Sequence, residues 1–252
     1  MTRILIMGLP GSGKTYFTKI LKKKLNADWI NADVIRKQYR DWDFSRKGII
    51  RQSLRMHNLS IKSKQKIVIA DFICPFKKCR EIFKADFTIW MNTIKKGRFN
   101  RMNKIFQKPK NFDYEIKDFN SKLHSIIISD KLKPYKWNNK KPTSLMMGRF
   151  QPFHEGHYKL FEKILIKKGQ VLIFIKDVYK IRDNPFKFSK IKKMISLKLN
   201  KLYKNRFKIL KAPNITNICY GRTVGYKFNY IKLPLVIQKI SSTKIRKKLR
   251  SR

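Results

Sequence analysis

Two histidines at a helical spacing are the first residues in this chain that could do chemistry. His154 and His157 lie in the run GRFQPFHEGH, between the apolar residues 144–147 and a helical pattern over residues 158–168. A helix that begins here places both imidazoles on one face, and its free N–H groups face the turn. Gly156 lets a phosphate approach the backbone. We therefore expect a site that holds a triphosphate while its α-phosphorus is attacked.

A second phosphate site is expected near the start of the chain. A buried-strand pattern over residues 3–7 leads into GLPGSGKT, and a helical pattern over 16–25 follows. This is G-x-x-x-x-G-K-S/T in its strand–loop–helix setting, where backbone N–H groups wrap phosphate oxygens. Its lysine reaches the β- and γ-phosphates and its hydroxyl holds Mg²⁺. The expected ATP-binding residues are Gly8, Gly11, Ser12, Gly13, Lys14 and Thr15.

A carboxylate follows the second expected strand, residues 28–31. Asp33 lies three residues before Arg36, so a helix places both on one face. By itself such a pair is a common surface ion pair that contributes little. Beside a phosphate-binding loop, Asp33 could instead orient a substrate hydroxyl or contribute to the Mg²⁺ shell, as a second candidate ligand besides Thr15.

The N-terminal half resembles the adenylylsulfate kinases along nearly its whole length. GLPGSGKT, the Asp33-x-x-Arg36 step, Asp43-Phe44-Ser45 with Arg51 downstream, and the Pro75-Phe76 turn follow one another in the family's order. The resemblance implies that Lys14 and Asp33 are catalytic and that Asp33 assists the acceptor hydroxyl. It also implies that Arg36 and Arg51 grip the acceptor's phosphate or sulfate. A basic lid over residues 95–101 is implied as well, with Lys95, Arg98 and Arg101.

Three positions depart from that family's pattern. Ala32 replaces a glycine, Cys74 replaces a serine that often precedes the Pro-Phe pair, and Ile49 replaces an asparagine before the Ile-Arg pair. These changes affect the acceptor side more than the ATP side. Kinase chemistry is therefore better supported than adenylylsulfate as its substrate.

The GRFQPFHEGH run resembles the HxGH nucleotidyltransferases, and its longer form looks most like the nicotinamide-mononucleotide adenylyltransferase branch. Asn184-Pro185-Phe186 and the run ISSTKIR, residues 240–246, match two further segments of these transferases. Hydroxyls at a helix start are by themselves ordinary caps. The resemblance implies that His154 and His157 are catalytic and that the nucleotide-binding residues are Gly148, Arg149, Phe150, His154, Gly156, His157, Ser241, Ser242, Thr243 and Arg246.

The alternation of strands and helices predicts an α/β chain with parallel sheets. We expect two three-layer domains, a P-loop kinase fold over residues 1–132 and a Rossmann-like HxGH fold over residues 144–252. The stretch between them, residues 133–143, is polar and contains two prolines, so we interpret it as a linker.

Composition narrows the expected location and partners. No apolar run approaches the ~20 residues of a membrane span, and three cysteines without metal-ligand spacing suggest reduced thiols in the cytoplasm. The net charge of +47 comes from lysines and arginines spread along the whole chain. A polyanion partner and a biased genome composition both explain this charge, and the even spread favours the second. Weak nonspecific binding to nucleic acid at low salt is expected in either case.

These features together predict a cytoplasmic transferase with small-molecule substrates, ATP and Mg²⁺. One site would phosphorylate a hydroxyl, and the other would transfer a nucleotidyl group to a phosphate monoester with release of pyrophosphate. Two named versions remain open, a sulfate-activating enzyme and a ribosylnicotinamide kinase joined to a nicotinamide-mononucleotide adenylyltransferase. A non-enzymatic alternative is a basic, nucleotide-binding regulatory protein. The acceptor, the base of the nucleotide and the oligomeric state are not predicted.

Overall fold

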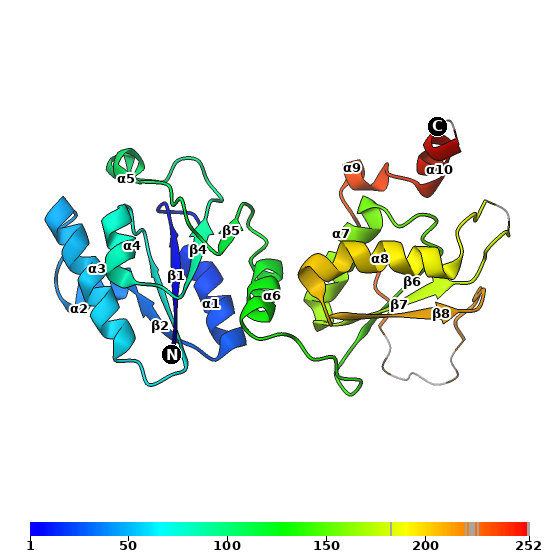
Figure 1. The fold of residues 1–252 in the computed structure, drawn as a ribbon, viewed down its shortest axis with the longest axis horizontal. Coiled ribbons are helices and arrows are strands. Elements are labelled where there is room, and N and C mark those ends of the chain that lie inside the picture. Colours follow the sequence, from blue (N-terminus) through cyan, green and yellow to red (C-terminus); the bar gives the residue numbers. More distant parts are fainter. Residues whose placement is uncertain (182, 220, 222–224, 226, 251–252) are drawn as a thin grey trace. The chain divides into compact units, whose positions relative to one another are not determined.

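The structure is a computed structural model that divides the chain into two compact units, residues 1–129 and 130–252 (Figure 1). It describes all residues except 182, 220, 222–224, 226, 251 and 252, and the side chains of 247–250 are also not described. Each unit is considered by itself below.

The first unit is built on a five-stranded sheet in which every pair of neighbouring strands is parallel. The strand order is β2-β3-β1-β4-β5. The central strand β1 has no exposed surface from Ile4 to Met7, as expected for a parallel strand covered on both faces. The strands are β1 (Thr2–Gly8), β2 (Asp28–Asn31), β3 (Ile67–Phe72), β4 (Phe87–Met91) and β5 (Tyr114–Ile116).

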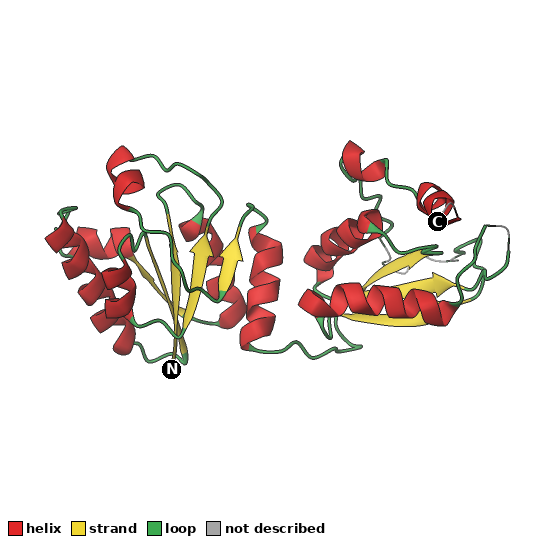
Figure 2. Ribbon diagram, turned by 45° about the horizontal axis from the view of Figure 1, so that its top comes forward, coloured by secondary structure: helices red, strands yellow, loops and turns green. Residues whose placement is uncertain are grey.

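Helices cover both faces of this sheet (Figure 2). Several of them begin with side-chain caps that satisfy free N–H groups. Asn31 accepts from the N–H groups of Asp33 and Val34, and Ser45 accepts from that of Gly48. The helices are α1 (Lys14–Leu25), α2 (Ala32–Gln38), α3 (Arg46–Ile61), α4 (Lys77–Phe83), α5 (Asn100–Ile105) and α6 (Ser121–Leu132).

The second unit contains a three-stranded parallel sheet with the order β6-β7-β8. Two helices pack their apolar faces into its core, where Phe161, Leu165, Ile195, Leu199 and Tyr203 are fully buried, and the central strand adds the fully buried Val171, Ile173 and Ile175. The strands are β6 (Ser144–Gly148), β7 (Val171–Lys176) and β8 (Phe207–Ala212), and the helices are α7 (Glu155–Lys168), α8 (Phe188–Tyr203), α9 (Leu235–Gln238) and α10 (Ser242–Arg250).

The expected fold class, α/β with two parallel sheets, is confirmed. Four short elements were not expected from the sequence: α4, α5, β5 and α9. The stretch interpreted as a linker is held to the second unit through the buried Gln170. Its side chain bonds the Tyr135 hydroxyl at 3.0 Å and the Asn138 carbonyl at 2.8 Å. Among the described residues, no helix is long and apolar enough to cross a membrane.

Candidate active sites

The phosphate-binding loop of the first unit lies between β1 and α1. Gly11 and Gly13 have φ angles of 90° and 87°, a left-handed conformation that glycine adopts at little cost. A Cβ atom at Gly8 would lie 2.5 Å from the carbonyl oxygen of Met91, so β4 fits against the loop only if that residue is glycine. Lys14 donates its ammonium protons to the carbonyls of Gly8 and Leu9, at 3.0 and 2.9 Å.

Two groups in this loop are suited to a bound anion. Burial lowers the pKa of Lys14 to about 8, against the opposing effect of Asp71 and Asp33. A phosphate beside the ammonium would favour its charged form. The hydroxyl of Ser12 is buried and is the one buried side-chain oxygen or nitrogen without a hydrogen-bond partner among the residues that the structure describes. Since buried polar groups normally find a partner, an added ligand would satisfy it.

A buried carboxylate that sequence reasoning missed completes the loop. Asp71 is 2% exposed at the end of β3, and its Oδ2 atom accepts the hydroxyl proton of Thr15 at 3.1 Å. Its Oδ1 atom accepts from Trp29 Nε1 at 2.8 Å and Asn31 Nδ2 at 3.0 Å. Burial raises the pKa of Asp71, and these hydrogen bonds and Lys14 act in the opposite direction. A carboxylate beside a hydroxyl is an oxygen donor set that fits Mg²⁺.

Asp33, the residue expected to assist the acceptor, lies in the first turn of α2. Its side chain is exposed, and it lies close enough to Lys14 to affect that ammonium electrostatically. The side-chain oxygen Oδ1 of Asn31, which caps α2, fixes the backbone here by accepting the N–H of Asp33 at 3.1 Å. The structure thus brings Lys14, Thr15, Asp33 and Asp71 to the carboxyl ends of β1, β2 and β3, the edge at which parallel sheets bind ligands.

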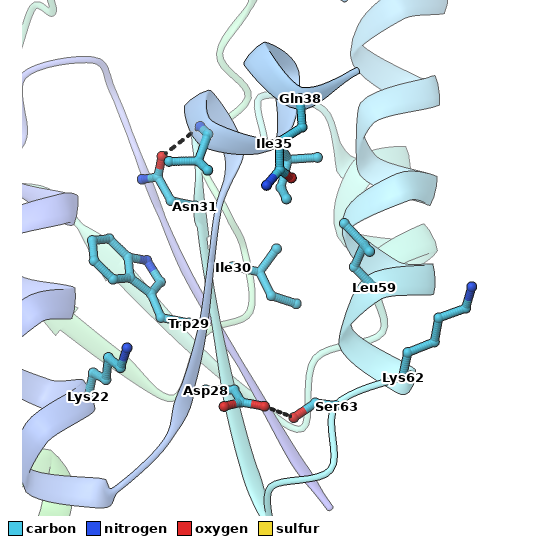
Figure 3. A pocket seen from close by; sticks show the side chains of 11 residues that line it. Lys22, Asp28, Trp29, Ile30, Asn31, Ile35, Gln38, Leu59, Lys62 and Ser63 are labelled. Carbon is cyan, nitrogen blue, oxygen red and sulfur yellow. Dashed lines mark hydrogen bonds between the residues drawn. The ribbon is translucent and has the colours of Figure 1, made fainter. Parts of the chain in front are cut away.

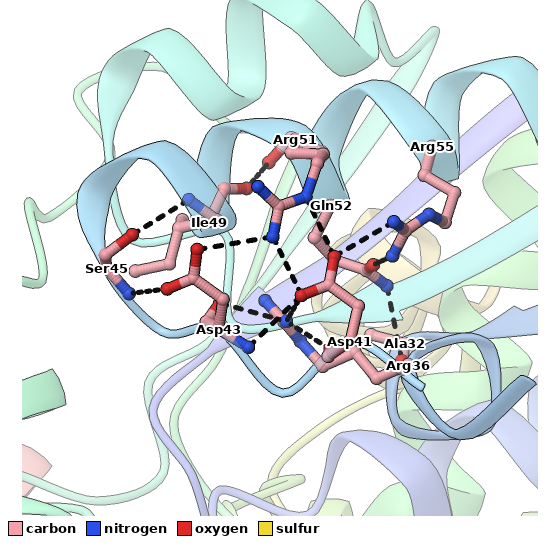
Figure 4. A network of polar contacts seen from close by, with 11 residues as sticks. Ala32, Arg36, Asp41, Asp43, Ser45, Ile49, Arg51, Gln52 and Arg55 are labelled. Atoms are coloured by element: carbon pink, nitrogen blue, oxygen red, sulfur yellow. Dashed lines mark hydrogen bonds and ion pairs between the residues drawn. The ribbon is translucent and has the colours of Figure 1, made fainter. Parts of the chain in front are cut away.

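The two arginines expected to grip the acceptor lie together, but both already have partners (Figure 4). Arg36 is 5% exposed and donates to the backbone carbonyls of Asp41 and Asp43 at 2.9 and 3.1 Å. Arg51 makes two bonds of 2.9 Å to the carboxylate of Asp41 and one of 3.2 Å to Asp43. Arg55 adds a bond of 2.9 Å to Asp41. The hydrogen bonds from Arg51 and Arg55 hold the pKa of Asp41 well below its usual range.

The expected lid contacts the phosphate-binding loop directly. The N–H of Arg98 donates to the carbonyl of Pro10 at 3.4 Å, and the side chain of Arg98 passes close to Gly11. Thr93 donates its hydroxyl proton to the carbonyl of Ser12 at 2.8 Å. Lys95 and Arg101 are exposed. Of the three lid cations, Arg98 is the one that the structure places on the loop.

In the second unit, the two histidines stack at the start of α7 with ring centroids 3.8 Å apart. Nδ1 of His157 accepts the N–H of His154 at 3.3 Å, and Nδ1 of His154 accepts the N–H of Gly156 at 3.1 Å. Both Nδ1 atoms are therefore unprotonated, and each neutral ring carries its proton on Nε2. Burial lowers the pKa of both rings, that of His157 to about 3, so both are neutral donors at neutral pH.

The three segments singled out in the second half of the sequence meet at Gln151. Its side chain bonds both backbone groups of Phe186, with its Nε2 atom donating to the carbonyl at 2.9 Å and its Oε1 atom accepting the N–H at 2.9 Å. Its own carbonyl accepts from Arg246 Nη1 at 2.6 Å. The hydroxyl of Ser242 donates to the carbonyl of Pro152 at 3.4 Å. The start of α10 therefore lies against the histidine turn.

The remaining residues expected in this site occupy varied environments. Gly148 ends β6, and a Cβ atom there would lie 2.9 Å from the buried ring of Phe150. Arg149 is exposed. The hydroxyl of Ser241 caps α10 by accepting the N–H of Lys244 at 3.2 Å, and Thr243 accepts from Arg246 at 3.3 Å.

Comparison with known proteins bears on the first unit alone. The family model for adenylylsulphate kinase matches residues 1–112. The first unit is an adenylylsulphate-kinase-like P-loop domain. No curated protein was found to match the chain. The family match ends before the second unit begins. The function of the histidine site is therefore inferred from the residues of that site alone.

Two solved structures are similar to the first half of the chain. The APS kinase of Mycobacterium tuberculosis, in complex with AMPPNP and APS, is 18% identical, with a TM-score of 0.47 over 52% of this chain and 97% of that one. The shikimate kinase of Aquifex aeolicus is 17% identical, with a TM-score of 0.40 over 52% of this chain and 96% of that one.

Proposed function

We propose that the first unit transfers the γ-phosphoryl group of ATP to a hydroxyl group of a small molecule. The observation that carries this proposal is the grouping of Lys14, Thr15 and Asp71 around a glycine loop that holds a partnerless buried hydroxyl. The family match to adenylylsulphate kinase supports it.

The residues of the first unit have complementary tasks in this reaction. The loop N–H groups and Lys14 bind the β- and γ-phosphates, while Thr15 and Asp71 would hold Mg²⁺. When bound, this ion neutralises charge on the phosphate oxygens. The oxygen of the acceptor hydroxyl bonds to the γ-phosphorus while the bond from that phosphorus to the β–γ bridging oxygen breaks. Asp33 accepts the proton that the hydroxyl loses. Arg98 supplies positive charge from the lid.

For the second unit we propose nucleotidyl transfer from a nucleoside triphosphate, ATP in the simplest case, to a phosphate monoester. The two Nε2–H groups and the first turns of α7 and α10 offer donors to the phosphates. A monoester oxygen attacks the α-phosphorus, the bond to the α–β bridging oxygen breaks, and pyrophosphate leaves. No side chain becomes covalently bound, so catalysis consists of positioning and charge stabilisation.

The two proposed reactions fit one another chemically, because a kinase product is a phosphate monoester. Adenylylsulfate with sulfate activation, and ribosylnicotinamide with dinucleotide synthesis, are the two named versions of the substrates. Arg51 bears on the choice, since an adenylylsulfate acceptor held by this side chain would have to compete with Asp41 and Asp43.

The test is a phosphorus NMR assay of the full chain with Mg²⁺ and ATP. Adenylylsulfate, ribosylnicotinamide and nicotinamide mononucleotide serve as acceptors, together with a set of sugar alcohols and sugar phosphates. Lys14→Ala and Asp71→Asn should each slow phosphorylation by about 100-fold or more, and should leave the release of pyrophosphate from ATP in the presence of a supplied monoester unchanged. His154→Ala should do the reverse, so the two sites act as controls for each other.

Each activity can fail separately. If Lys14→Ala leaves ADP formation unchanged, the kinase assignment is wrong. If no monoester causes pyrophosphate to be released from ATP, in a protein that binds ATP at both sites, the transferase assignment is wrong. A kinase product that the second site does not consume would disprove the coupling while leaving both activities in place.

A further inference from the structure

A cavity of about 520 Å³ lies along the free edge of the first sheet, apart from the phosphate-binding loop (Figure 3). The edge strand β2 runs through it, and side chains of α1, α2 and α3 close it on either side. No residue of the loop 8–15 or of the lid lines it. Its volume falls within the ~300–1,000 Å³ range of sites for small organic molecules.

The interior of this edge cavity is apolar and includes one flat ring. The indole of Trp29 lies on one side of β2, and Ile30 lies on the other, facing Ile35 and Leu59 (Figure 3). Trp29 and Leu59 are only partly buried, so both present surface to an occupant. An occupant that lies across the edge of β2 would meet the indole on one side and aliphatic side chains on the other, and such surfaces favour a flat apolar body.

The charged groups at the edge cavity favour an anion. Lys22 and Lys62 are exposed lining residues, and among the described side chains neither has a carboxylate within ion-pair distance. The ammonium of Lys22 lies 5.9 Å from the ring centroid of Trp29. The carboxylate of Asp28 also lines the cavity, where it accepts a hydrogen bond from the hydroxyl of Ser63 and keeps its negative charge. Two lysines and one carboxylate therefore leave one net positive charge at the cavity.

We propose that the edge cavity binds a small anion with a flat, aromatic body, the ring against Trp29 and the anionic group beside Lys22, while Lys62 adds positive charge from the other side of β2. A peptide that adds to the sheet is less well suited, because β2 offers four residues to pair with. A second copy of the chain is disfavoured by its net charge of +47.

The edge cavity is linked to the phosphate-binding loop through two hydrogen bonds. Trp29 and Asn31 both line the cavity and both donate to Oδ1 of Asp71. The other carboxylate oxygen of Asp71 accepts from Thr15 in the loop. An occupant that moves the indole therefore changes how Asp71 is held beside the nucleotide. This coupling, unlike the cavity itself, rests on the proposed ATP site, and it must be reciprocal.

Binding is tested with 8-anilinonaphthalene-1-sulfonate, which has the proposed flat body and anionic group and fluoresces when it leaves water. We expect saturable binding of one equivalent to the full chain. The double variant Lys22→Glu/Lys62→Glu should weaken it about tenfold or more, roughly 1.4 kcal/mol. Lys23→Glu/Lys64→Glu makes the same change of charge at exposed lysines outside the cavity, and it should change the affinity less than about twofold.

Equal weakening by the two double variants would overturn the proposal, since the probe would then respond to the overall field of the protein. Leu59→Trp gives a second reading, because it fills the cavity without changing charge. It should abolish the one-equivalent binding, and unchanged binding in this variant also overturns the proposal. All three variants should fold, because the lysines are exposed and Leu59 is half-buried. Circular dichroism of each variant checks that its fold is unchanged.

The coupling is tested by repeating the titration with saturating Mg²⁺ and ATP. We expect the probe affinity to change at least about threefold in the native chain and to stay constant in Trp29→Phe, which keeps a ring but loses the donor to Asp71. An unchanged affinity in the native chain, with ATP shown to be bound, disproves the coupling. If the chain binds the probe but no ATP, the ATP site is disproved, and the proposal that the edge cavity binds an aromatic anion is unaffected.

Discussion

At the scale of single residues, both candidate sites depend on how neighbouring groups fix a protonation state. Backbone N–H groups donate to Nδ1 of His154 and His157, which leaves Nε2–H groups to face a ligand. Burial keeps both rings neutral, and for His154 the charge of Lys198 acts in the same direction. In this site the negative charge of the phosphates would be met by Arg246 and by Lys198, which lies near His154 and forms an ion pair with Glu155 at 2.9 Å, while the imidazoles act as hydrogen-bond donors.

The stability of the second unit should therefore decrease as the solution is acidified. The pKa of His157 is about 3 in the folded chain, below its ordinary value of 6.5, so the unfolded chain binds more protons between these values. The contribution of His157 to the free energy of unfolding is therefore fully present above pH 6.5 and is lost as the pH falls toward 3. Between pH 7 and pH 5 we expect a loss of roughly 1–2 kcal/mol. It is measured by urea unfolding with tryptophan fluorescence, in a variant that keeps Trp137 and has phenylalanine in place of the three tryptophans of the first unit.

His157→Asn should remove most of this pH dependence, because the asparagine amide does not titrate. His124→Asn, which changes a histidine of the first unit, serves as the control and should leave the slope unchanged. If the free energy of unfolding of the His157 variant depends on pH as steeply as that of the native chain, the dependence comes from another group and not from the buried ring of His157.

Residues whose role depends on local sequence were predictable, and residues whose role depends on a distant partner were not. The positions of Lys14, Thr15, His154 and His157 follow from loop and helix geometry that a short run of sequence determines. Asp71 stands at the end of a buried-strand pattern, and its importance comes from pairing of β3 with β1, which puts it beside a loop 56 positions away. A carboxylate at the end of a strand next to a P-loop strand is the signal that could have revealed it.

At the scale of elements, one buried glutamine connects the segments of the second site. The bonds of Gln151 to Phe186 and Arg246 join the histidine turn, the loop before α8 and helix α10. Long strands and helices were predictable from periodicity, such as β1, β7 and α8. The short elements β5 and α9 were not, because three or four residues carry too little pattern to separate a helix from a strand.

Truncation of Gln151 should therefore cost both stability and nucleotide affinity. Gln151→Ala leaves the N–H and carbonyl groups of Phe186 without partners, and we expect a loss of about 1–3 kcal/mol in unfolding free energy. The bond of Arg246 to the backbone carbonyl of residue 151 remains, but the loop before α8 is no longer fixed to the histidine turn. Nucleotide binding at the second site should therefore weaken about tenfold. Urea unfolding and isothermal titration calorimetry in the Lys14→Ala background measure the two effects.

Gln170→Ala is the matched control. Gln170 is also fully buried in the second unit and bonds several partners, but it holds the segment before β6 and not the histidine turn. This variant should lose similar stability and keep its nucleotide affinity. If both variants lose affinity equally, Gln151 acts only through general stability.

At the scale of the whole molecule, the charge of +47 comes from lysines and arginines that are spread along the sequence of both units. Many aromatic rings have a lysine nearby, such as Phe186 with Lys190 at 4.7 Å and Tyr158 with Lys198 at 5.2 Å. Such pairs are common in a chain rich in lysine and do not by themselves define a nucleic-acid site. A field of this kind attracts polyanions without selecting among them.

We therefore expect the full chain to bind single-stranded DNA weakly, without sequence preference and with a strong dependence on salt. In fluorescence anisotropy with a labelled 20-mer, the Kd should rise at least about 100-fold between 50 and 200 mM salt, because several phosphates release counterions on binding. Lys14→Ala and His154→Ala should not alter the Kd or the slope, since each removes one charge at most from a chain that contains 62 lysines and arginines. Binding that persists at high salt, or that favours one sequence, would mean that a dedicated nucleic-acid surface exists and that the excess of lysine is more than a feature of composition.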